Sequence, residues 1–280
     1  MAVEKNPERL KVLEKIEELE KKRLWSKDVE EDPPTIPLQP DMVDYGYRKF
    51  SSKVKSFFAN FVAYNFIESL LRKKKLIIKD VIGLENYTSI KDRGIVLTCN
   101  HFNAFDNFAI HKIFMPHAKS GVIWKVIREG NYTNFPGLYG FFFKYCNTLP
   151  LSSNFSTMRN FMDGVKYLLK KKRTILIYPE QGMWWNYKKP RPMENGAFRF
   201  AASNGVPIVP VFICMTDSDK IDSDGFPVQE YTVNVLKPIF PDGTLTLKEN
   251  VKMMNEVNYQ EWKECYEKFY GIPLKYLEQE

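Results

Sequence analysis

The feature that most constrains the fold of this 280-residue chain is the alternation, from residue 76 onward, of short apolar runs with helical periods. Short apolar runs bounded by turn residues predict strands, and apolar residues at three-to-four spacing predict helices. The predicted strands are 94–99, 121–127, 148–151, 174–178, 207–213 and 231–236, and the predicted helices are 105–114, 135–145, 155–171 and 197–203. Such alternation is typical of an α/β fold, so we expect a mixed central sheet flanked by helices, preceded by N-terminal amphipathic helices.

The composition argues against several other classes of protein. Hydrophobic residues make up 44% and charged residues 27% of the chain, unlike collagen-like, disordered or coiled-coil chains. The most apolar stretch, 57–67, is short and interrupted by two asparagines, so we expect no conventional membrane-spanning helix. The acidic start does not resemble a signal peptide. The four cysteines lie far apart without a histidine at metal-ligand spacing, so we expect neither disulfides nor a metal site.

The first 75 residues divide into two segments ahead of the α/β domain, which we place at 76–280. Residues 1–44 combine an amphipathic helical pattern with a proline-rich stretch, which we interpret as a charged helix and a stiff linker forming an appendage. Residues 45–75 form a second helical segment. Between residues 47 and 75, eight basic residues face one acid, a net charge of +7 that equals the formal net charge of the whole chain.

The basic segment also has a broad apolar face rich in phenylalanine. Phe57, Phe58 and Phe61 follow Lys53 and Lys55, and further cations end the segment. Such a helix suits the surface of an anionic bilayer, where aromatic side chains enter below the headgroups and cations meet lipid phosphates. The alternative is that this face packs on the protein's own core. We disfavour nucleic acid as a partner because no RNA-binding or zinc-finger pattern accompanies the charge.

His101 is the side chain best placed for acid-base chemistry. It follows the apolar run 94–99 almost directly, at the carboxyl end of a predicted strand, where α/β proteins place their sites. Asp106 follows five residues later, which on a regular helix is an offset of about 140°. A bend from strand through turn to helix is therefore needed to bring the two together. The carboxylate would then fix the imidazole tautomer and stabilise its charged form.

The residues around His101 resemble the first motif of the glycerolipid acyltransferases, the family of 1-acylglycerol-3-phosphate acyltransferases. That motif is Asn-His, four residues, then Asp, and it reads Asn-His-Phe-Asn-Ala-Phe-Asp at 100–106. Further motifs follow in the family's order, with Tyr-Pro-Glu-Gln-Gly at 178–182, Gly-Ala-Phe-Arg-Phe-Ala at 196–201 and Val-Pro-Ile-Val-Pro-Val at 206–211. The similarity covers about residues 80–237, most of the α/β part.

The resemblance implies an O-acyltransferase of phospholipid biosynthesis. It would move a fatty acyl group from acyl-CoA or an acyl carrier protein thioester to a lysophospholipid hydroxyl, above all that of 1-acylglycerol-3-phosphate, giving phosphatidic acid. His101 would act as general base and Asp106 would orient it, without an acyl-enzyme, metal or other cofactor. The expected location is the cytoplasmic face of the cell membrane, as a peripheral or monotopic protein. The alternatives are another glycerolipid or glycolipid acceptor, or a non-catalytic lipid-binding relative.

The sequence also departs from the family's pattern where the acceptor phosphate is bound. The second motif of the family usually ends in an arginine, but Ser152 and Ser153 stand here, and a second arginine after the third motif is missing. The candidates to supply the positive charge are Lys125, Arg159 and the group Lys188, Lys189 and Arg191. The alternative for each is an ordinary solvated charge. Trp184 is expected to line an acyl entrance, although it could simply pack. The other residues expected to contact substrate are Asn100, Asn103, Glu180, Gln181 and Gly182.

Overall fold

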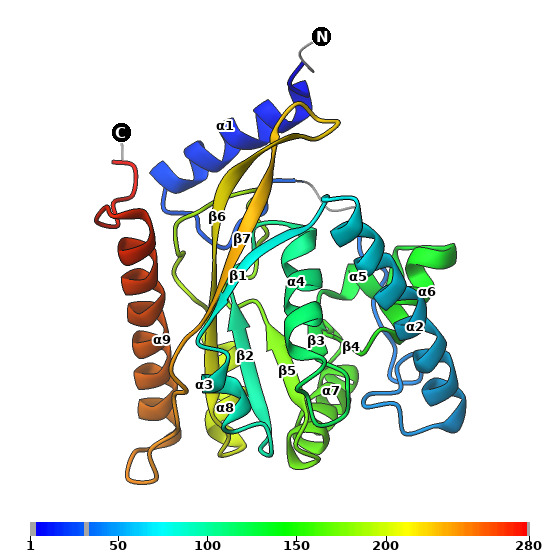
Figure 1. The fold of residues 1–280 in the computed structure, drawn as a ribbon. Coiled ribbons are helices and arrows are strands. Elements are labelled where there is room, and N and C mark those ends of the chain that lie inside the picture. Colours follow the sequence, from blue (N-terminus) through cyan, green and yellow to red (C-terminus); the bar gives the residue numbers. More distant parts are fainter. Residues whose placement is uncertain (1–3, 31–33, 279–280) are drawn as a thin grey trace.

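The computed structural model describes residues 4–30 and 34–278. A seven-stranded sheet forms its centre, with the strand order β1-β7-β6-β2-β5-β3-β4 (Figure 1). The strands are β1 (Ile77–Ile82), β2 (Ile95–Cys99), β3 (Trp124–Ile127), β4 (Thr148–Pro150), β5 (Thr174–Ile177), β6 (Ile208–Ile221) and β7 (Pro227–Val235). Neighbouring strands are parallel except β6 and β7, which form an antiparallel hairpin. The predicted mixed α/β sheet is therefore confirmed.

Helices cover both faces of this sheet and extend beyond it (Figure 1). They are α1 (Pro7–Lys21), α2 (Phe50–Arg72), α3 (Glu85–Thr88), α4 (Ala104–Phe114), α5 (Glu129–Thr133), α6 (Gly137–Tyr145), α7 (Phe155–Lys170), α8 (Gly196–Ser203) and α9 (Leu247–Tyr270). The sequence analysis missed β1 and placed the start of β7 too late. Strand β1 lies at the edge of the sheet without a fully buried residue, and Lys79 and Asp80 interrupt its apolar residues, so its apolar signal is weak. In β7, Gln229 and Glu230 interrupt the apolar residues, so the clear apolar run begins only at Tyr231.

Alternate residues of the central strands supply two separate cores. Leu97 and Cys99 of β2 pack with α4 and with the end of α2, whereas Val96 of the same strand packs with α7 and α8. Helix α9 covers β6 on the second face, where Trp262 packs on Phe212. Because β2 is buried on both faces, its sequence is a continuous apolar run rather than an alternating one.

The N-terminal helix, expected to be a charged appendage, packs on the α/β part of the chain. Helix α1 lies across the tip of the β6–β7 hairpin (Figure 1). Its apolar residues Val12, Ile16 and Leu19 form a core cluster with Trp184 and Trp185. The buried carboxylate of Glu20 accepts from Lys189 Nζ at 2.6 Å, so the helix is anchored by charge as well as by apolar contact.

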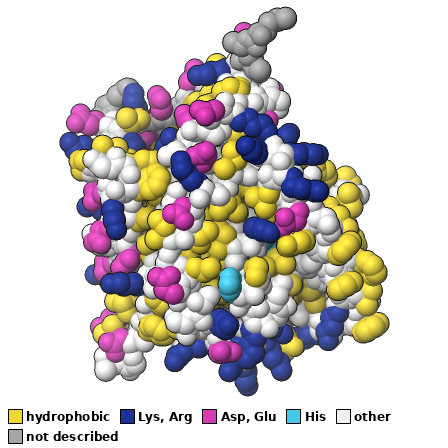
Figure 2. Space-filling view, viewed as in Figure 1, with side chains coloured by type: hydrophobic (Ala, Val, Ile, Leu, Met, Phe, Trp, Pro, Cys, Tyr) yellow, Lys and Arg dark blue, Asp and Glu magenta, His cyan; other side chains and the backbone are white. Residues whose placement is uncertain are grey.

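Helix α2 turns its small residues inward and its phenylalanines outward. The buried positions near its start are Ser52, Ser56 and Ala59, and the helix packs along α6. Phe57, Phe58 and Phe61 are 70%, 58% and 62% exposed, which excludes the alternative that these rings pack in the protein's own core. Figure 2 shows hydrophobic side chains gathered over α2 and α6 at the right of the molecule, with Lys and Arg side chains beside them. Within residues 4–30 and 34–278, no helix is long and apolar enough to cross a membrane.

Candidate active site

Four parallel strands bring the residues of the site to one edge of the sheet. Strands β2, β5, β3 and β4 are neighbours in that order, and their carboxyl ends lie on the same side. His101 follows β2, the Tyr-Pro-Glu-Gln-Gly motif at 178–182 follows β5, and Arg128 follows β3. Residues that are far apart in the sequence therefore meet at this edge, where α/β folds commonly bind ligands.

The bend that the His101–Asp106 spacing requires is present. Asn103 is the N-cap of α4 in an extended conformation, and its side chain accepts from the backbone of the first helical turn while Asp106 completes a capping box. The chain thus reverses direction between the strand and the helix. As a result, His101 Nδ1 lies 2.8 Å from Asp106 Oδ2. Since a carboxylate only accepts, Nδ1 carries the proton and Nε2 is left as the basic nitrogen.

Asp106 is fully buried and holds the imidazole through a network of donors. Its Oδ2 accepts from the backbone N–H groups of Phe102 and Asn103 as well as from His101. Its Oδ1 accepts from the Tyr178 hydroxyl at 2.7 Å, and the Tyr178 ring stacks on His101 with centroids 4.0 Å apart. Burial, together with the nearby Asp106 carboxylate, raises the pKa of Tyr178 well above its ordinary value, so it remains a neutral donor. Sequence reasoning missed Tyr178, although its place at the end of β5 was a usable signal.

Glu180 and Arg191 form a buried ion pair behind the histidine. Arg191 Nη2 lies 2.7 Å from Glu180 Oε2, and the two side chains are 1% and 2% exposed. The backbone N–H of His101 donates to the same Oε2 at 3.0 Å, and the backbone N–H of Arg191 donates to Oε1. Arg191 also donates to the carbonyl oxygens of Gly182 and Trp25. Glu180 therefore fixes the loop that carries His101, and Arg191 neutralises the charge of Glu180.

These contacts change the roles expected for several residues. Arg191 was predicted to meet the acceptor phosphate, but its guanidinium is enclosed by Glu180 and backbone carbonyls. Trp184 was predicted to line an acyl entrance, but it is fully buried, stacks on Trp25 and donates to the carbonyl of Lys27. Both residues thus hold the segment 22–30 against the third motif.

The asparagines and the glycine of the motifs also have structural partners. Asn100 exchanges two hydrogen bonds with the backbone of Ile213, which joins the end of β2 to β6. Asn103 caps α4, and the N–H of Gly182 donates to the carbonyl of Glu180. Gln181 is exposed at the edge of the site with a positive φ of 64°. Of the residues expected to contact substrate near these motifs, Gln181 is thus the one whose side chain faces solvent.

Two further predicted cations lie in different surroundings. Lys125 on β3 is half-buried beside Asn107 of α4, and burial lowers its pKa. Arg159 is exposed on α7. The structure does not join Arg159 to the His101 network, whereas Lys125 belongs to the strand that ends at the site.

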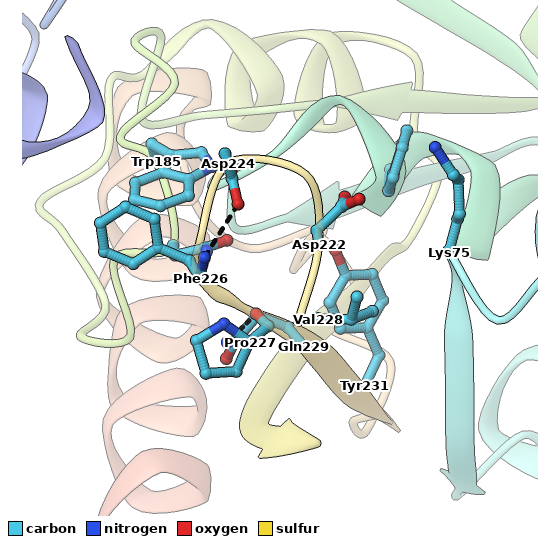
Figure 3. Close-up of a pocket in the computed structure, with 11 residues that line it drawn as sticks. Lys75, Trp185, Asp222, Asp224, Phe226, Pro227, Val228, Gln229 and Tyr231 are labelled. Carbon is cyan, nitrogen blue, oxygen red and sulfur yellow. Dashed lines mark hydrogen bonds between the residues drawn. The ribbon is translucent and has the colours of Figure 1, made fainter. Parts of the chain in front are cut away.

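Two hollows are lined in part by residues close in sequence to the site motifs, and His101 lines neither of them. One, of ≈ 40 Å³, is lined by residues of the β6–β7 hairpin together with Phe105, Trp185 and Asn186, and Trp185 packs edge to face on Phe226 (Figure 3). This volume holds little more than one water molecule. The other, of ≈ 390 Å³, lies beside Arg128 and Phe135, and has the size of a small-molecule site.

The arrangement supplies a general base and lacks an evident protein nucleophile. His101, 22% exposed, can accept a proton at Nε2 while Asp106 balances the charge that forms. Burial raises the pKa of Cys99 well above its ordinary value, so this neighbouring thiol stays protonated. Among the residues that the structure describes, no group of three His, Cys, Asp or Glu side chains is placed to hold a metal ion. The geometry suits direct proton removal from a hydroxyl.

The part of the chain that holds this site is an acyltransferase domain. Residues 80–214 match the family model described as Acyltransferase, which confirms the resemblance seen in the sequence and the assignment as an O-acyltransferase.

A solved structure has a similar fold, that of the 1-acyl-sn-glycerophosphate (LPA) acyltransferase PlsC from Thermotoga maritima. The likeness covers 84% of this chain and 92% of that chain, with a TM-score of 0.52 and 20% sequence identity. At this identity the likeness establishes the shared fold. No curated protein matches the chain by sequence.

Proposed function

We propose that this protein transfers a fatty acyl group from an acyl-CoA or acyl carrier protein thioester to the free hydroxyl of a lysophospholipid, with 1-acylglycerol-3-phosphate as the preferred acceptor. The observation that carries the proposal is the 2.8 Å contact between His101 Nδ1 and the buried Asp106 carboxylate. PlsC, the similar solved structure, is described as acting on such an acceptor. Phosphatidic acid is then the product.

In the proposed reaction, Nε2 of His101 removes the acceptor's hydroxyl proton as its oxygen attacks the thioester carbonyl. The C–S bond breaks, the thiolate leaves, and the imidazolium returns its proton to the thiolate. Asp106 keeps Nδ1 protonated, and its negative charge stabilises the imidazolium. The Tyr178 hydroxyl and two backbone N–H groups donate to the Asp106 carboxylate and hold it in position. No prosthetic group takes part. Holding two lipid-like substrates together gives such a site most of its rate gain.

We further propose that the enzyme works on an anionic bilayer, at the cytoplasmic face of the cell membrane and as a peripheral or monotopic protein. The exposed rings of Phe57, Phe58 and Phe61 support this, because apolar side chains of this size are costly to leave in water. Lys53 and Lys55 are exposed on the same helix, and Leu138 and Tyr139 extend the apolar surface onto α6. Both substrates dissolve in or bind to membranes, so this surface would bring the site to them.

The test is acyl transfer by purified protein from labelled acyl-CoA or acyl carrier protein thioesters to a panel of lysolipids. Transfer to 1-acylglycerol-3-phosphate is expected, and His101→Ala should lower kcat by roughly 100-fold to 10,000-fold, because general base catalysis supplies about that much. His117→Ala, a histidine outside the network, is the matched control and should retain activity. Transfer that survives in a folded His101→Ala protein would contradict the mechanism, and failure with every lysolipid would contradict the function.

A further inference from the structure

A salt bridge at the edge of the site joins two parts of the chain that are distant in sequence. Arg128 follows β3, and its two terminal nitrogens lie 2.7 Å and 2.6 Å from the two carboxylate oxygens of Asp28, which precedes the proline-rich linker. The same guanidinium donates to the carbonyl oxygen of Gln181 at 2.9 Å. Asp28 thus presents two oxygens to an arginine fork, as a phosphate group does.

The sheet register places Arg128 close to the general base. Lys125 and Leu97 both pair with Leu176 of β5, so Arg128 stands level with Asn100, one residue before His101. Strand β5 lies between β2 and β3, so the backbones at Asn100 and Arg128 are two strand spacings apart, roughly 10 Å. An extended arginine side chain covers a good part of that distance. A phosphate a few bonds away from the hydroxyl at His101 therefore falls within reach of Arg128.

Arg128 also lines the larger hollow, of ≈ 390 Å³, together with Asn131, Asn134 and Phe135. Glu129 and Ser153 line it too, but both Glu129 oxygens are occupied, accepting from Leu38 and Ser152 and from the backbone and hydroxyl of Ser153. The serines that replace the family's arginine are thus tied to Glu129. The cation at this hollow is Arg128 instead.

We propose that Arg128 binds the phosphate of the acceptor lipid, and that Asp28 occupies the same fork when no acceptor is bound. This inference rests on the proposed function and names the residue that selects a phosphorylated acceptor. The Arg128 and Asp28 side chains are 37% and 38% exposed, and a salt bridge this exposed is weak enough for a phosphate to displace. A phosphate brings more negative charge than a carboxylate, so the exchange favours the acceptor.

The two partners of the salt bridge give opposite predictions. Arg128→Gln should raise the acceptor KM by roughly tenfold or more and leave kcat and the donor KM nearly unchanged, as expected for loss of uniform binding. Asp28→Asn breaks the same salt bridge but keeps the guanidinium, so it should leave the acceptor KM unchanged or lower it. If the salt bridge mattered only for structure, both variants would raise KM alike. Arg199→Gln, an exposed arginine on α8, is the matched control.

Kinetics with full-length protein and two acceptors complete the test. The preference for 1-acylglycerol-3-phosphate over 1-acylglycerol, which lacks the phosphate, should collapse in Arg128→Gln. Inorganic phosphate should compete with the acceptor in the wild type and less in this variant. An unchanged preference, or an increase confined to the KM of acyl-CoA, would overturn the proposal. If the wild type transfers no acyl group at all, the proposed function fails separately, and binding of 1-acylglycerol-3-phosphate measured by calorimetry still decides the role of Arg128.

Discussion

Replacing Arg191 by Met should strongly destabilise the protein, because it leaves the Glu180 carboxylate buried without a countercharge. The two side chains are almost completely enclosed, and Nη2 of Arg191 lies 2.7 Å from Oε2 of Glu180. Breaking a buried ion pair in this way typically costs about 3–5 kcal/mol. A domain is stable by only ~5–15 kcal/mol, so a large part of the unfolding free energy is at stake.

Replacing Arg191 also removes hydrogen bonds that hold the N-terminal segment in place. Arg191 also donates to the carbonyl oxygens of Trp25 and Gly182, which hold the N-terminal segment on the third motif. Since His101 donates its backbone N–H to Glu180, a displaced carboxylate also disturbs the general base. We therefore expect Arg191→Met to lower kcat as well as stability.

Urea unfolding followed by circular dichroism measures the effect, and the midpoint should fall by on the order of 1 M or more. Arg199→Met, on the exposed side of α8, is the control and should stay within ~0.5 kcal/mol of the wild type. The double variant Glu180→Leu with Arg191→Met should be more stable than Arg191→Met alone, since it removes the unpaired carboxylate. A loss below about 1 kcal/mol in Arg191→Met would refute this account of the ion pair.

Three further predictions concern other parts of the structure. Asp106→Asn should lose most acyl transfer, measured as steady-state kcat. Tyr178→Phe should lower kcat only several-fold, because the Tyr178 hydroxyl supplies one of the hydrogen bonds to Asp106, worth about 1 kcal/mol. Changing Phe57, Phe58 and Phe61 to Ser should abolish flotation with anionic liposomes without lowering the unfolding midpoint, since the rings are exposed; unfolding of this variant would contradict surface exposure. Burial, with Lys125 nearby, holds the pKa of His111 well below its ordinary value of 6.5. Below about pH 6.5 the unfolded chain therefore binds a proton that the folded protein does not, and the unfolding free energy should fall by up to ~1.4 kcal/mol per pH unit. His111→Gln should flatten that dependence in urea titrations at several pH values.

The central strands and the His101–Asp106 pair could be predicted because their signals are local. Strand β2 is a continuous apolar run, and the spacing from His101 to Asp106 is set by one turn and one helix start. Edge strand β1 gave no comparable signal, because none of its residues is fully buried and two charged residues interrupt its apolar ones. Local sequence thus reveals an element when burial imposes a pattern on its own residues.

The surroundings of the catalytic pair could not be predicted, because they depend on contacts between distant segments. No local pattern joins Arg191 to Trp25, or Arg128 to Asp28, and each pair forms only when the N-terminal segment crosses the carboxyl edge of the sheet. The partner of α1 could not be predicted for the same reason: the charge pattern of α1 is that of a solvated helix, yet its apolar stripe meets Trp184 and Trp185.

The position of the N-terminal segment also has a consequence for how the site is completed. The Trp25 and Lys27 carbonyls accept from Arg191 and Trp184, and the Asp28 carboxylate binds Arg128. Helix α2 begins only after the linker and carries the exposed phenylalanines. One continuous stretch therefore runs from the edge of the active site to the proposed membrane surface. Because Asp28 occupies the fork of Arg128, release of that fork by an acceptor phosphate would loosen this stretch at its active-site end. Acceptor binding and the attachment of the N-terminal segment are thus expected to be coupled through the Arg128–Asp28 ion pair.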